Sequence, residues 1–334
     1  MIHESAIHTP TSCLFSAPFD FLPQVVRDFQ SHISTEFREI WNYDELPDHS
    51  TVVAWVPNPG QVFVIDEHVL VRFPALRVIV TPSTGHNHMN LEACSTRGVA
   101  VYSLLDDRKA LERISASAEF TLLLLLNTMR RLDFAVGEVS SRSMRTREAL
   151  LRGHELAGKR VGLVGLGRIG RRMQRYCTAF DALVTYCDPH VTDVTLPGVS
   201  LPELFETCDA VCLCCALTDE THGMINYDLL CRLPLGAAFV NTSRGEVVVE
   251  QDLVRVLDER SDLRVGLDVI CGEVENRHGV SPLLPFHDSG QIVVTPHIAG
   301  ATVESQEKAA RAALGILKGV LDNNLSMTPK KQAM

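Results

Sequence analysis

Residues 161–170 read VGLVGLGRIG, and they are the most informative stretch of the chain. An apolar run there breaks into glycines with the pattern G-x-G-x-x-G. Gly165 permits a tight turn, Gly167 lets a phosphate group approach the backbone, and Gly170 lets a helix pack closely on the preceding strand. The stretch therefore predicts a strand, a phosphate-binding turn and a helix whose N-terminus offers free N–H groups to an anion.

An acidic residue follows at the position that a dinucleotide site requires. The apolar run 182–187 ends at Asp188, 23 residues after Gly165 (188 − 165 = 23), which is the usual spacing of a βαβ unit. A carboxylate there accepts hydrogen bonds from both ribose hydroxyls of NAD and repels the 2′-phosphate of NADP. No Arg or Lys follows in residues 189–194. We expect an NAD site rather than an ordinary glycine-rich turn.

Length and charge restrict the class of protein. A chain of 334 residues exceeds what one hydrophobic core usually supports, so two domains are expected. The composition, with 46% hydrophobic and 22% charged residues, is that of a globular protein. The net charge of −10 argues against a nucleic-acid surface, because such surfaces cluster Lys and Arg.

The cysteines and the apolar runs indicate a cytoplasmic protein. The ten cysteines are scattered and show no paired metal-ligand spacing, so buried thiols are expected, with no metal site. Residues 1–15 lack the basic and apolar regions of a secretory signal. Apolar runs such as 122–126 and 210–217 are too short to span a membrane.

Strand-like and helix-like segments alternate along the chain, which predicts parallel, doubly wound sheets. Strands are expected at 13–17, 52–56, 76–81, 182–187, 210–214, 238–241, 263–268 and 291–295. Helices are expected at 22–31, 66–73, 107–131, 171–180, 252–259 and 303–322. The helix at 107–131 has one heavily apolar face, which suits either a buried core helix or a subunit contact.

Charged side chains follow three late strands, where ligands of open α/β sheets collect. Arg244 lies in NTSRG, Glu273 follows GLDV, and His297 lies in TPHIAG. Singly, they could be a surface cation, a solvated loop charge and a histidine that caps a strand. Together they are what reduction of a 2-oxoacid requires.

Each of the three residues suits one part of that reaction. His297 is the best proton donor, because imidazole titrates near neutral pH. Glu273 beside it would favour the imidazolium form. Arg244 offers a planar fork of donors that can hold a carboxylate and polarise the adjacent carbonyl. In the oxidative direction His297 would act as the base.

These motifs carry a family resemblance. GLVGLGRIG with Asp188, NTSRGEVV, GLDV with Glu273, and TPHIAGAT resemble, in this order and spacing, the D-isomer-specific 2-hydroxyacid dehydrogenases, which include glyoxylate and hydroxypyruvate reductases and D-3-phosphoglycerate dehydrogenases. The resemblance implies Arg244, Glu273 and His297 as the catalytic set. It places Asp268 near the nicotinamide carboxamide.

The resemblance also implies which residues bind cofactor and substrate. For the cofactor these are Gly165, Gly167, Arg168, Ile169, Gly170, Asp188, Cys215, Thr242, Asp268, Gly300 and Thr84. For the substrate they are Thr84, Gly85, His86 and Arg244, with the substrate carboxylate at the turn 84–86.

The fold implied by the resemblance has two Rossmann-like doubly wound α/β domains. An NAD-binding domain, residues 105–297, is inserted in a smaller flavodoxin-like substrate domain made of residues 1–104 and 298–334. The C-terminal helix crosses back onto the substrate domain. Homodimers form through the NAD domain, with helices such as 116–131 in the interface.

Some positions depart from the family pattern. Ala216 replaces a rigid proline in the cofactor loop, Val249 replaces an acidic residue, and Val274 replaces the proline after the catalytic Glu. Asn87 and His88 stand where Asp-Asn is more usual. None of these changes removes a reacting group, so they bear on affinity and loop geometry.

The substrate follows less directly from the sequence. The loop 55–60, WVPNPG, offers no cation for a phosphorylated substrate, which favours a small or partly apolar 2-oxoacid. Two other functions stay open: an NAD-sensing protein of the kind found among transcriptional corepressors, and a dehydrogenase of the same fold that oxidises phosphite or formate.

Overall fold

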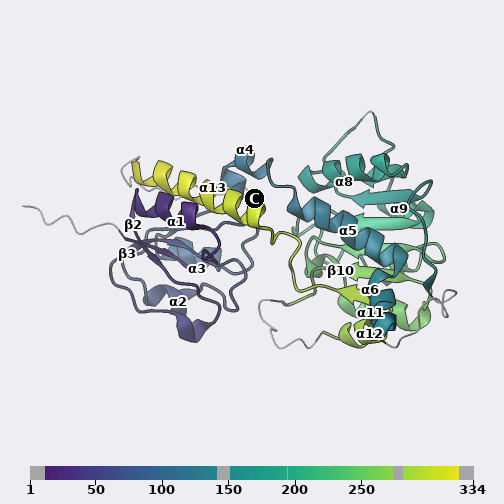
Figure 1. Cartoon of the computed structure of the whole chain (residues 1–334), viewed down its shortest axis with the longest axis horizontal. Helices are drawn as coiled ribbons and strands as arrows, with labels where there is room; N and C mark the ends of the chain where they lie inside the picture. Colours follow the sequence, from purple (N-terminus) through teal and green to yellow (C-terminus); the bar gives the residue numbers. More distant parts are fainter. Residues whose placement is uncertain (1–11, 141–150, 194, 274–280, 323–334) are drawn as a thin grey trace, which may run out of the picture. The chain divides into compact units, whose positions relative to one another are not determined.

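The computed structural model describes residues 12–140, 151–193, 195–273 and 281–322, which form two compact units (Figure 1). Unit 1 comprises Met1–Ile114 and Thr302–Met334, and unit 2 comprises Ser115–Ala301. The sequence placed these boundaries after residues 104 and 297. The first lies later because Leu104 and Ile114 pack against Ala309 and Ala312 of the C-terminal helix.

Unit 1 is a five-stranded parallel sheet in the order β2-β1-β3-β4-β5, the order of flavodoxin. Its strands are β1 (Ser12–Phe15), β2 (Ser34–Phe37), β3 (Val52–Val56), β4 (Val78–Val80) and β5 (Ala100–Tyr102). The central strands β3 and β4, VVAWV and VIV, are almost wholly buried. Parallel strands covered on both faces require such continuous apolar runs.

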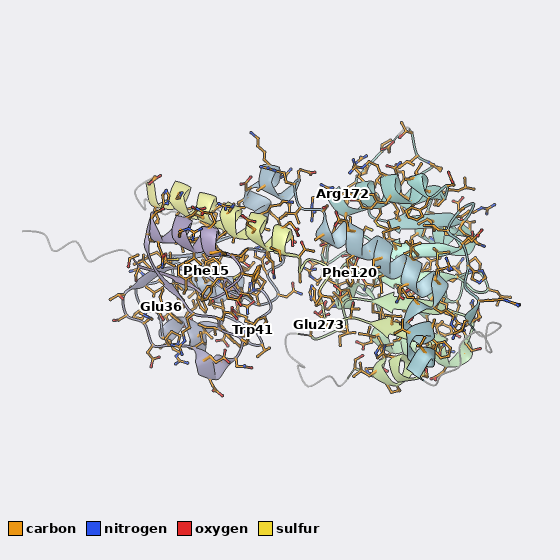
Figure 2. The ribbon with its side chains drawn as sticks, viewed as in Figure 1. Phe15, Glu36, Trp41, Phe120, Arg172 and Glu273 are labelled. Carbon is orange, nitrogen blue, oxygen red and sulfur yellow. The ribbon has the colours of Figure 1, made fainter. Side chains whose placement is uncertain are left out.

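Helices from both ends of the sequence complete unit 1. They are α1 (Pro23–Gln30), α2 (Glu67–Val71), α3 (Leu91–Thr96), α4 (Arg108–Leu111) and α13 (Val303–Asp322). Figure 1 shows α13 beside α1, although the two helices lie at opposite ends of the sequence. Ala310 and Ala313 of α13 are buried in the core around Phe15, which is labelled in Figure 2. Small residues on this face let α13 approach the sheet closely.

Unit 2 is a six-stranded parallel sheet in the order β11-β10-β9-β8-β6-β7. Its strands are β6 (Arg160–Val164), β7 (Leu183–Cys187), β8 (Ala210–Leu213), β9 (Ala238–Asn241), β10 (Arg264–Leu267) and β11 (Ile292–Val294). Strand order reverses between β6 and β8, which makes their carboxyl ends the topological switch point where ligands of such sheets bind.

Helices cover both faces of the unit 2 sheet. One core cluster includes Leu124, Leu125 and Met129 of α5 (Ala116–Arg130) and Met173 of α8 (Arg168–Ala179). The other faces α9 (Leu201–Thr207), α10 (Tyr227–Leu230) and α11 (Glu250–Glu259). The remaining helices described in the unit are α6 (Leu132–Ser140) and α12 (Leu284–Asp288). The prediction of two doubly wound α/β domains is confirmed.

Two details of the secondary structure differ from the sequence prediction. The single helix expected at 107–131 is divided into α4 and α5, because the boundary between the units falls between Ile114 and Ser115. Strands β2 and β5 were missed: β2 has the largely polar sequence STEF, and β5 has only three residues, AVY, none of them fully buried.

All ten cysteines are free thiols, and five of them, such as Cys13 and Cys212, are buried. Burial raises the pKa of Cys13 to about 12. Among the described residues, no cluster of His, Cys, Asp and Glu has the make-up of a metal site. The described helices are each too short or too polar to cross a membrane.

Candidate active site

The glycine turn at the end of β6 has the geometry that its sequence predicts. Gly165 has a φ of +94°, and a Cβ there would lie 2.9 Å from Cys215 Cα. A Cβ on Gly170 would lie 2.2 Å from the Gly165 carbonyl oxygen, so the close packing of helix on turn requires glycine. At Gly167 a Cβ would meet no described atom within 4 Å. The turn therefore leaves room beside Gly167, where a phosphate group would approach the backbone.

The N-terminus of α8 faces this space. Gly167 is its N-cap residue and has no side chain to cap the helix, and Arg168 and Ile169 form its first turn. Uncapped N–H groups at a helix N-terminus favour an anion. This is the expected position for a dinucleotide pyrophosphate.

Asp188 lies directly after β7 and is oriented by the backbone. Its Oδ2 accepts a hydrogen bond from the N–H of Leu166 at 2.8 Å, and its Oδ1 accepts one from the N–H of His190 at 2.9 Å. The first of these bonds ties the carboxylate to the glycine turn. A ribose attached to a pyrophosphate at the turn would therefore meet a carboxylate that is already in place.

The loop after β8 forms the other side of the switch point. The N–H of Cys214 donates to the carbonyl of Val164 at 2.8 Å. Burial raises the pKa of the Cys215 thiol to about 11, opposed in part by a hydrogen bond with Ser243. At Ala216, where the family has proline, the carbonyl accepts a hydrogen bond from Thr221 Oγ1 at 2.7 Å. This hydrogen bond restrains the loop in place of the proline ring.

Arg244 is positioned by a tight turn at the end of β9. Asn241 organises this turn, since its Oδ1 accepts from the N–H of Ser243 at 2.9 Å and its Nδ2 donates to the carbonyl of Arg244 at 2.9 Å. Burial lowers the pKa of Arg244, and the nearby Glu273 and Glu246 oppose this shift. Arginine has so high an intrinsic pKa that the guanidinium remains charged.

Thr242, in the same turn, is held from α5. Its hydroxyl lies 2.6 Å from that of Thr121, which itself donates to the carbonyl of Ser117 at 2.6 Å. A hydroxyl has one hydrogen to donate, so Thr242 is the donor of this pair. Its oxygen is thus oriented to accept a further hydrogen bond.

Gly245 brings the Arg244 turn against the loop that carries Glu273. A Cβ at Gly245 would lie 2.1 Å from the carbonyl carbon of Ile270 and 2.4 Å from the nitrogen of Cys271. Only a residue without a side chain permits this contact between two backbones. The RG pair of NTSRG is the sequence signal for it.

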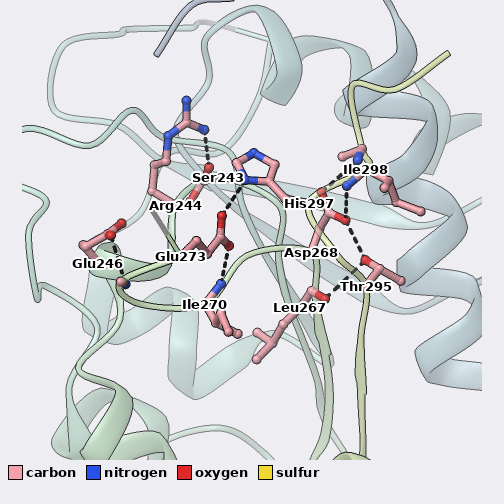
Figure 3. Close-up of polar contacts among 12 residues, drawn as sticks. Ser243, Arg244, Glu246, Leu267, Asp268, Ile270, Glu273, Thr295, His297 and Ile298 are labelled. Carbon is pink, nitrogen blue, oxygen red and sulfur yellow. Dashed lines mark hydrogen bonds and ion pairs between the residues drawn. The ribbon is translucent and has the colours of Figure 1, made fainter. Parts of the chain in front are cut away.

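Glu273 and His297 form an ion-pair geometry in front of the sheet (Figure 3). Glu273 Oε2 lies 2.6 Å from His297 Nδ1, and Glu273 Oε1 accepts from the N–H of Ile270 at 2.6 Å. Since a carboxylate only accepts, Nδ1 of the imidazole carries the hydrogen. Nε2, on the other side of the ring, then faces away from Glu273.

His297 itself has an unusual backbone. Its φ is +54°, in the left-handed region that non-glycine residues seldom occupy. Its N–H donates to the carbonyls of Asp268 and Thr295, both at 2.9 Å. The side chain is 47% exposed, so the ring is open to a ligand. Strain of this kind, when the surroundings impose it, is common at functional sites.

Asp268 is the residue that fixes the His297 segment. It is 1% exposed, and it accepts hydrogen bonds from Thr295 Oγ1 at 2.6 Å, from the N–H of Ile298 at 2.9 Å and from that of Ala299 at 2.8 Å. Burial raises the pKa of its carboxyl, while these hydrogen bonds oppose the rise. All three bonds go to residues 295–299, so Asp268 acts on His297 as a positioning residue.

The remaining predicted residues lie in two places. Gly300 is in unit 2, with Ser117 Oγ 3.9 Å from the position of a Cβ. Thr84, Gly85 and His86 are partly buried residues of unit 1, in the loop after β4. Ser83 Oγ donates to the carbonyl of Gly85 at 2.9 Å and so shapes this turn.

The two histidines of the loop after β4 have different surroundings. Burial lowers the pKa of His86, with the nearby Asp106 opposing the shift. His88 is 3% exposed, and its Nε2 lies 3.1 Å from Thr81 Oγ1. His88 is therefore a structural residue, where the family more often has Asn.

Comparisons with known proteins identify the family. A model described as "D-isomer specific 2-hydroxyacid dehydrogenase, NAD binding domain" matches residues 122–299. The human glyoxylate reductase/hydroxypyruvate reductase is 32% identical over 278 residues, covering 79% of this chain and 81% of that protein. A crystal structure of a Thermus thermophilus protein has a TM-score of 0.78 at 29% identity, covering 96% of this chain and all of the other.

A third similarity is to much longer proteins. The D-3-phosphoglycerate dehydrogenase of Mycobacterium tuberculosis is 30% identical over 273 residues, which are 79% of this chain and 49% of that enzyme. The chain thus spans about half the length of these relatives. The resemblance inferred from the motifs is confirmed: the chain belongs to the D-isomer specific 2-hydroxyacid dehydrogenases, and unit 2 carries their NAD-binding domain.

Proposed function

We propose that this protein is an NAD-dependent dehydrogenase that interconverts a D-2-hydroxyacid and its 2-oxoacid. The observation that carries the proposal is the Glu273–His297 pair, 2.6 Å apart, beside the strand-end turn that holds Arg244. NADH, when bound at the glycine turn, supplies the hydride. The open space at Gly167 and the oriented carboxylate of Asp188 fit the pyrophosphate and a ribose of that cofactor.

Arg244 is the residue for the substrate carboxylate. One of its amino groups, Nη1, donates to the carbonyl of Ser243 at 2.6 Å, which orients the guanidinium and leaves its remaining N–H groups for a ligand. A planar fork of donors binds a carboxylate and polarises the neighbouring carbonyl. Partial burial strengthens both interactions, because water competes less.

His297 moves the proton. As negative charge develops on the carbonyl oxygen, Nε2 donates its proton to that oxygen, and Glu273 stabilises the imidazolium before the transfer. In the oxidative direction Nε2 accepts the hydroxyl proton. Asp268 keeps the ring in place through its bonds to the flanking backbone.

The turn Thr84–Gly85–His86 of unit 1 supplies further contacts to the substrate carboxylate in this proposal, and Thr84 contacts the cofactor. Two observations in unit 1 favour a small substrate without a phosphate group. Loop 57–60 contains no cation. Arg72 is bound to Asp48, and Arg77 donates to the carbonyls of Pro74 and Leu76. The relatives named glyoxylate/hydroxypyruvate reductase act on substrates of this size.

We also propose a cytoplasmic homodimer that forms through unit 2. Free thiols in this number suit a reducing compartment, which is the basis for proposing the cytoplasm.

The proposed dimer rests on large apolar side chains that are exposed along α5 and α6, with Leu123, Leu132, Val136 and Val139 each more than half exposed. A surface of this kind on a globular protein favours a subunit contact. Light scattering, which gives the mass of the protein in solution, tests whether it is a dimer.

The activity is tested with a panel of 2-oxoacids and both reduced cofactors. Wild-type protein should oxidise NADH with at least one of glyoxylate, hydroxypyruvate, pyruvate or phenylpyruvate. The His297→Ala variant should lose about 10²- to 10⁴-fold in kcat, the usual contribution of a general acid. Its NADH affinity should stay close to that of the wild type. A variant that turns over normally would refute the assigned role.

Tight NADH binding by the wild type without turnover on any acid would favour the NAD-sensing alternative. The contact between Glu273 and His297, with Arg244 near Glu273, supports the enzyme instead. Oxidation of phosphite or formate is tested in the same assay with NAD. Glu273 beside His297 argues against formate, since a formate enzyme of this family is expected to lack that acidic partner.

A further inference from the structure

The loop after Asp188 contains a second carboxylate, Asp193, that is bound to a cation from another element. Arg171, in the first turns of α8, places its Nη1 2.8 Å from Asp193 Oδ2. Residues 189–194 contain no Arg or Lys, so the sequence predicts no cation here. The helix supplies one from 22 residues away. Figure 2 labels the next residue of that helix, Arg172.

Asp193 is held in place independently of Arg171. Its Oδ1 accepts from the N–H of Thr195 at 2.9 Å and from Thr195 Oγ1 at 2.6 Å. Its own N–H donates to the hydroxyl of the buried Tyr186 at 2.8 Å. The hydrogen bonds from Thr195 and Arg171 lower the pKa of Asp193 to about 2, so the carboxylate is charged at neutral pH.

Asp193 and Arg171 differ in how far their side chains are exposed and so free to move. The side chain of Asp193 is 15% exposed and that of Arg171 is 52% exposed. The carboxylate is thus the fixed member, and the long guanidinium side chain is the one that adjusts to it. His190, the basic residue of the same loop, also lies near a carboxylate, with Nε2 3.4 Å from Glu220 Oε2.

These contacts matter for the choice between NAD and NADP. A 2′-phosphate brings extra negative charge to the ribose, and proteins that accept it do so with an Arg near the acidic residue of the βαβ unit. Arg171 has the right chemistry and lies beside the right loop. The charge of Arg171 is already paired with that of Asp193, so a phosphate gains less from it, and turning the guanidinium toward the phosphate would break this ion pair.

We propose that Asp193 is a specificity-determining residue that excludes NADP by holding Arg171. Asp188 then acts on the ribose hydroxyls, and Asp193 pairs with Arg171, a cation that the glycine-motif helix brings to this loop. The inference rests on the proposed NAD-dependent function. Its test measures cofactor binding alone.

The decisive variant is Asp193→Asn. The amide oxygen can still accept from Thr195, whereas the amide nitrogen faces Arg171 and cannot hold it. The readout is the ratio of the dissociation constants of NADPH and NADH, from fluorescence titrations at one salt concentration. We expect the ratio to move about tenfold toward NADPH, because one charge-assisted hydrogen bond to phosphate is released for use. An unchanged ratio overturns the inference.

A double-mutant cycle separates the released guanidinium from the lost negative charge. Arg171→Ala alone should change the ratio less than about twofold, since the charge of Arg171 is paired with that of Asp193. In the Asp193→Asn background it should abolish the gain. A gain that survives without Arg171 contradicts the inference. If the Asn variant does not fold, Asp193→Ser replaces it, because serine keeps an oxygen for the N–H of Thr195. The same shift of the ratio toward NADPH is expected.

Glu220→Gln is the matched control, since it removes a carboxylate from the same region without releasing Arg171. At pH 8 it should leave the ratio unchanged, and a shift equal to that of Asp193→Asn would mean that net charge alone is responsible. Wild-type protein that binds neither dinucleotide would refute the proposed function together with this inference. Binding with an unmoved ratio in Asp193→Asn refutes this inference alone.

Discussion

Substituting alanine at two glycines of the same turn should separate folding from cofactor binding. At Gly170 the new methyl group would lie 2.2 Å from the Gly165 carbonyl oxygen, inside the contact distance of about 3.5 Å. At Gly167 it would meet no described protein atom within 4 Å. The change at Gly170 should therefore lower the stability of the fold, and the change at Gly167 should weaken cofactor binding.

The magnitudes follow from these distances. Forcing a methyl group against a backbone costs up to about 3 kcal/mol, and the gain in helix propensity offsets about 1 kcal/mol, which leaves about 2 kcal/mol at Gly170. Unit 2 has 187 residues (301 − 115 + 1 = 187), a size at which 1 kcal/mol shifts Tm by about 2–4 °C. The Tm of Gly170→Ala should fall by about 4–8 °C.

Gly167→Ala should behave differently. Replacing an N-cap glycine by alanine costs up to about 1 kcal/mol, so its Tm should fall by no more than about 4 °C. Its NADH dissociation constant should rise at least about tenfold, because the methyl group occupies the approach of the pyrophosphate. The assay is calorimetry of the apoprotein followed by NADH titration. A Gly167→Ala protein that binds NADH like the wild type would refute the assignment of the turn.

Three other residues give sharp expectations. Gly245→Ala should lower kcat by about 10²-fold or more, because its methyl group displaces the Ile270–Cys271 backbone that orients Glu273. NADH affinity should change less. Single-turnover kinetics measures the first effect and NADH titration the second. Asp268→Ala should destabilise unit 2 by about 3 kcal/mol, since three donors lose a buried acceptor, and denaturant unfolding measures the loss. The Cys215 thiol, with a pKa raised to about 11, should resist alkylation at pH 8, while the exposed Cys231 reacts. The alkylation rate of Cys215 should rise about tenfold per pH unit up to that pKa, and mass spectrometry of timed samples measures it.

Buried central strands could be predicted from the sequence, because both faces of a parallel sheet demand apolar residues. Val52–Val56 and Ala238–Asn241 were expected with these same bounds. Strand β2, STEF, could not be predicted in this way because it has no apolar run, and β5, AVY, is only three residues long. The break between α4 and α5 depends on the division into units, which local periodicity does not encode.

The candidate catalytic residues could be identified because each lies in the loop that follows a strand, and parallel strands end at one edge of the sheet. The contacts that hold these residues in place could not be predicted, because they join segments that are far apart in the sequence. Thr121 and Thr242 are 121 positions apart, and the fit of Gly245 depends on the backbone of Ile270. Arg171 and Asp193 show the limit most clearly, because a motif confined to one loop gives no sign of a cation supplied by a neighbouring helix.

The most direct measurement of the proposed function follows the hydride itself. NADH that carries deuterium at the transferred position is incubated with the protein and a 2-oxoacid, and the product is resolved by chiral chromatography and mass spectrometry. With an acid whose product is chiral, such as hydroxypyruvate or pyruvate, we predict a D-2-hydroxyacid with deuterium at C2, formed at least about 10²-fold more slowly by His297→Ala. An undeuterated product, an L-isomer, or equal rates for the two proteins would contradict the assignment of this site.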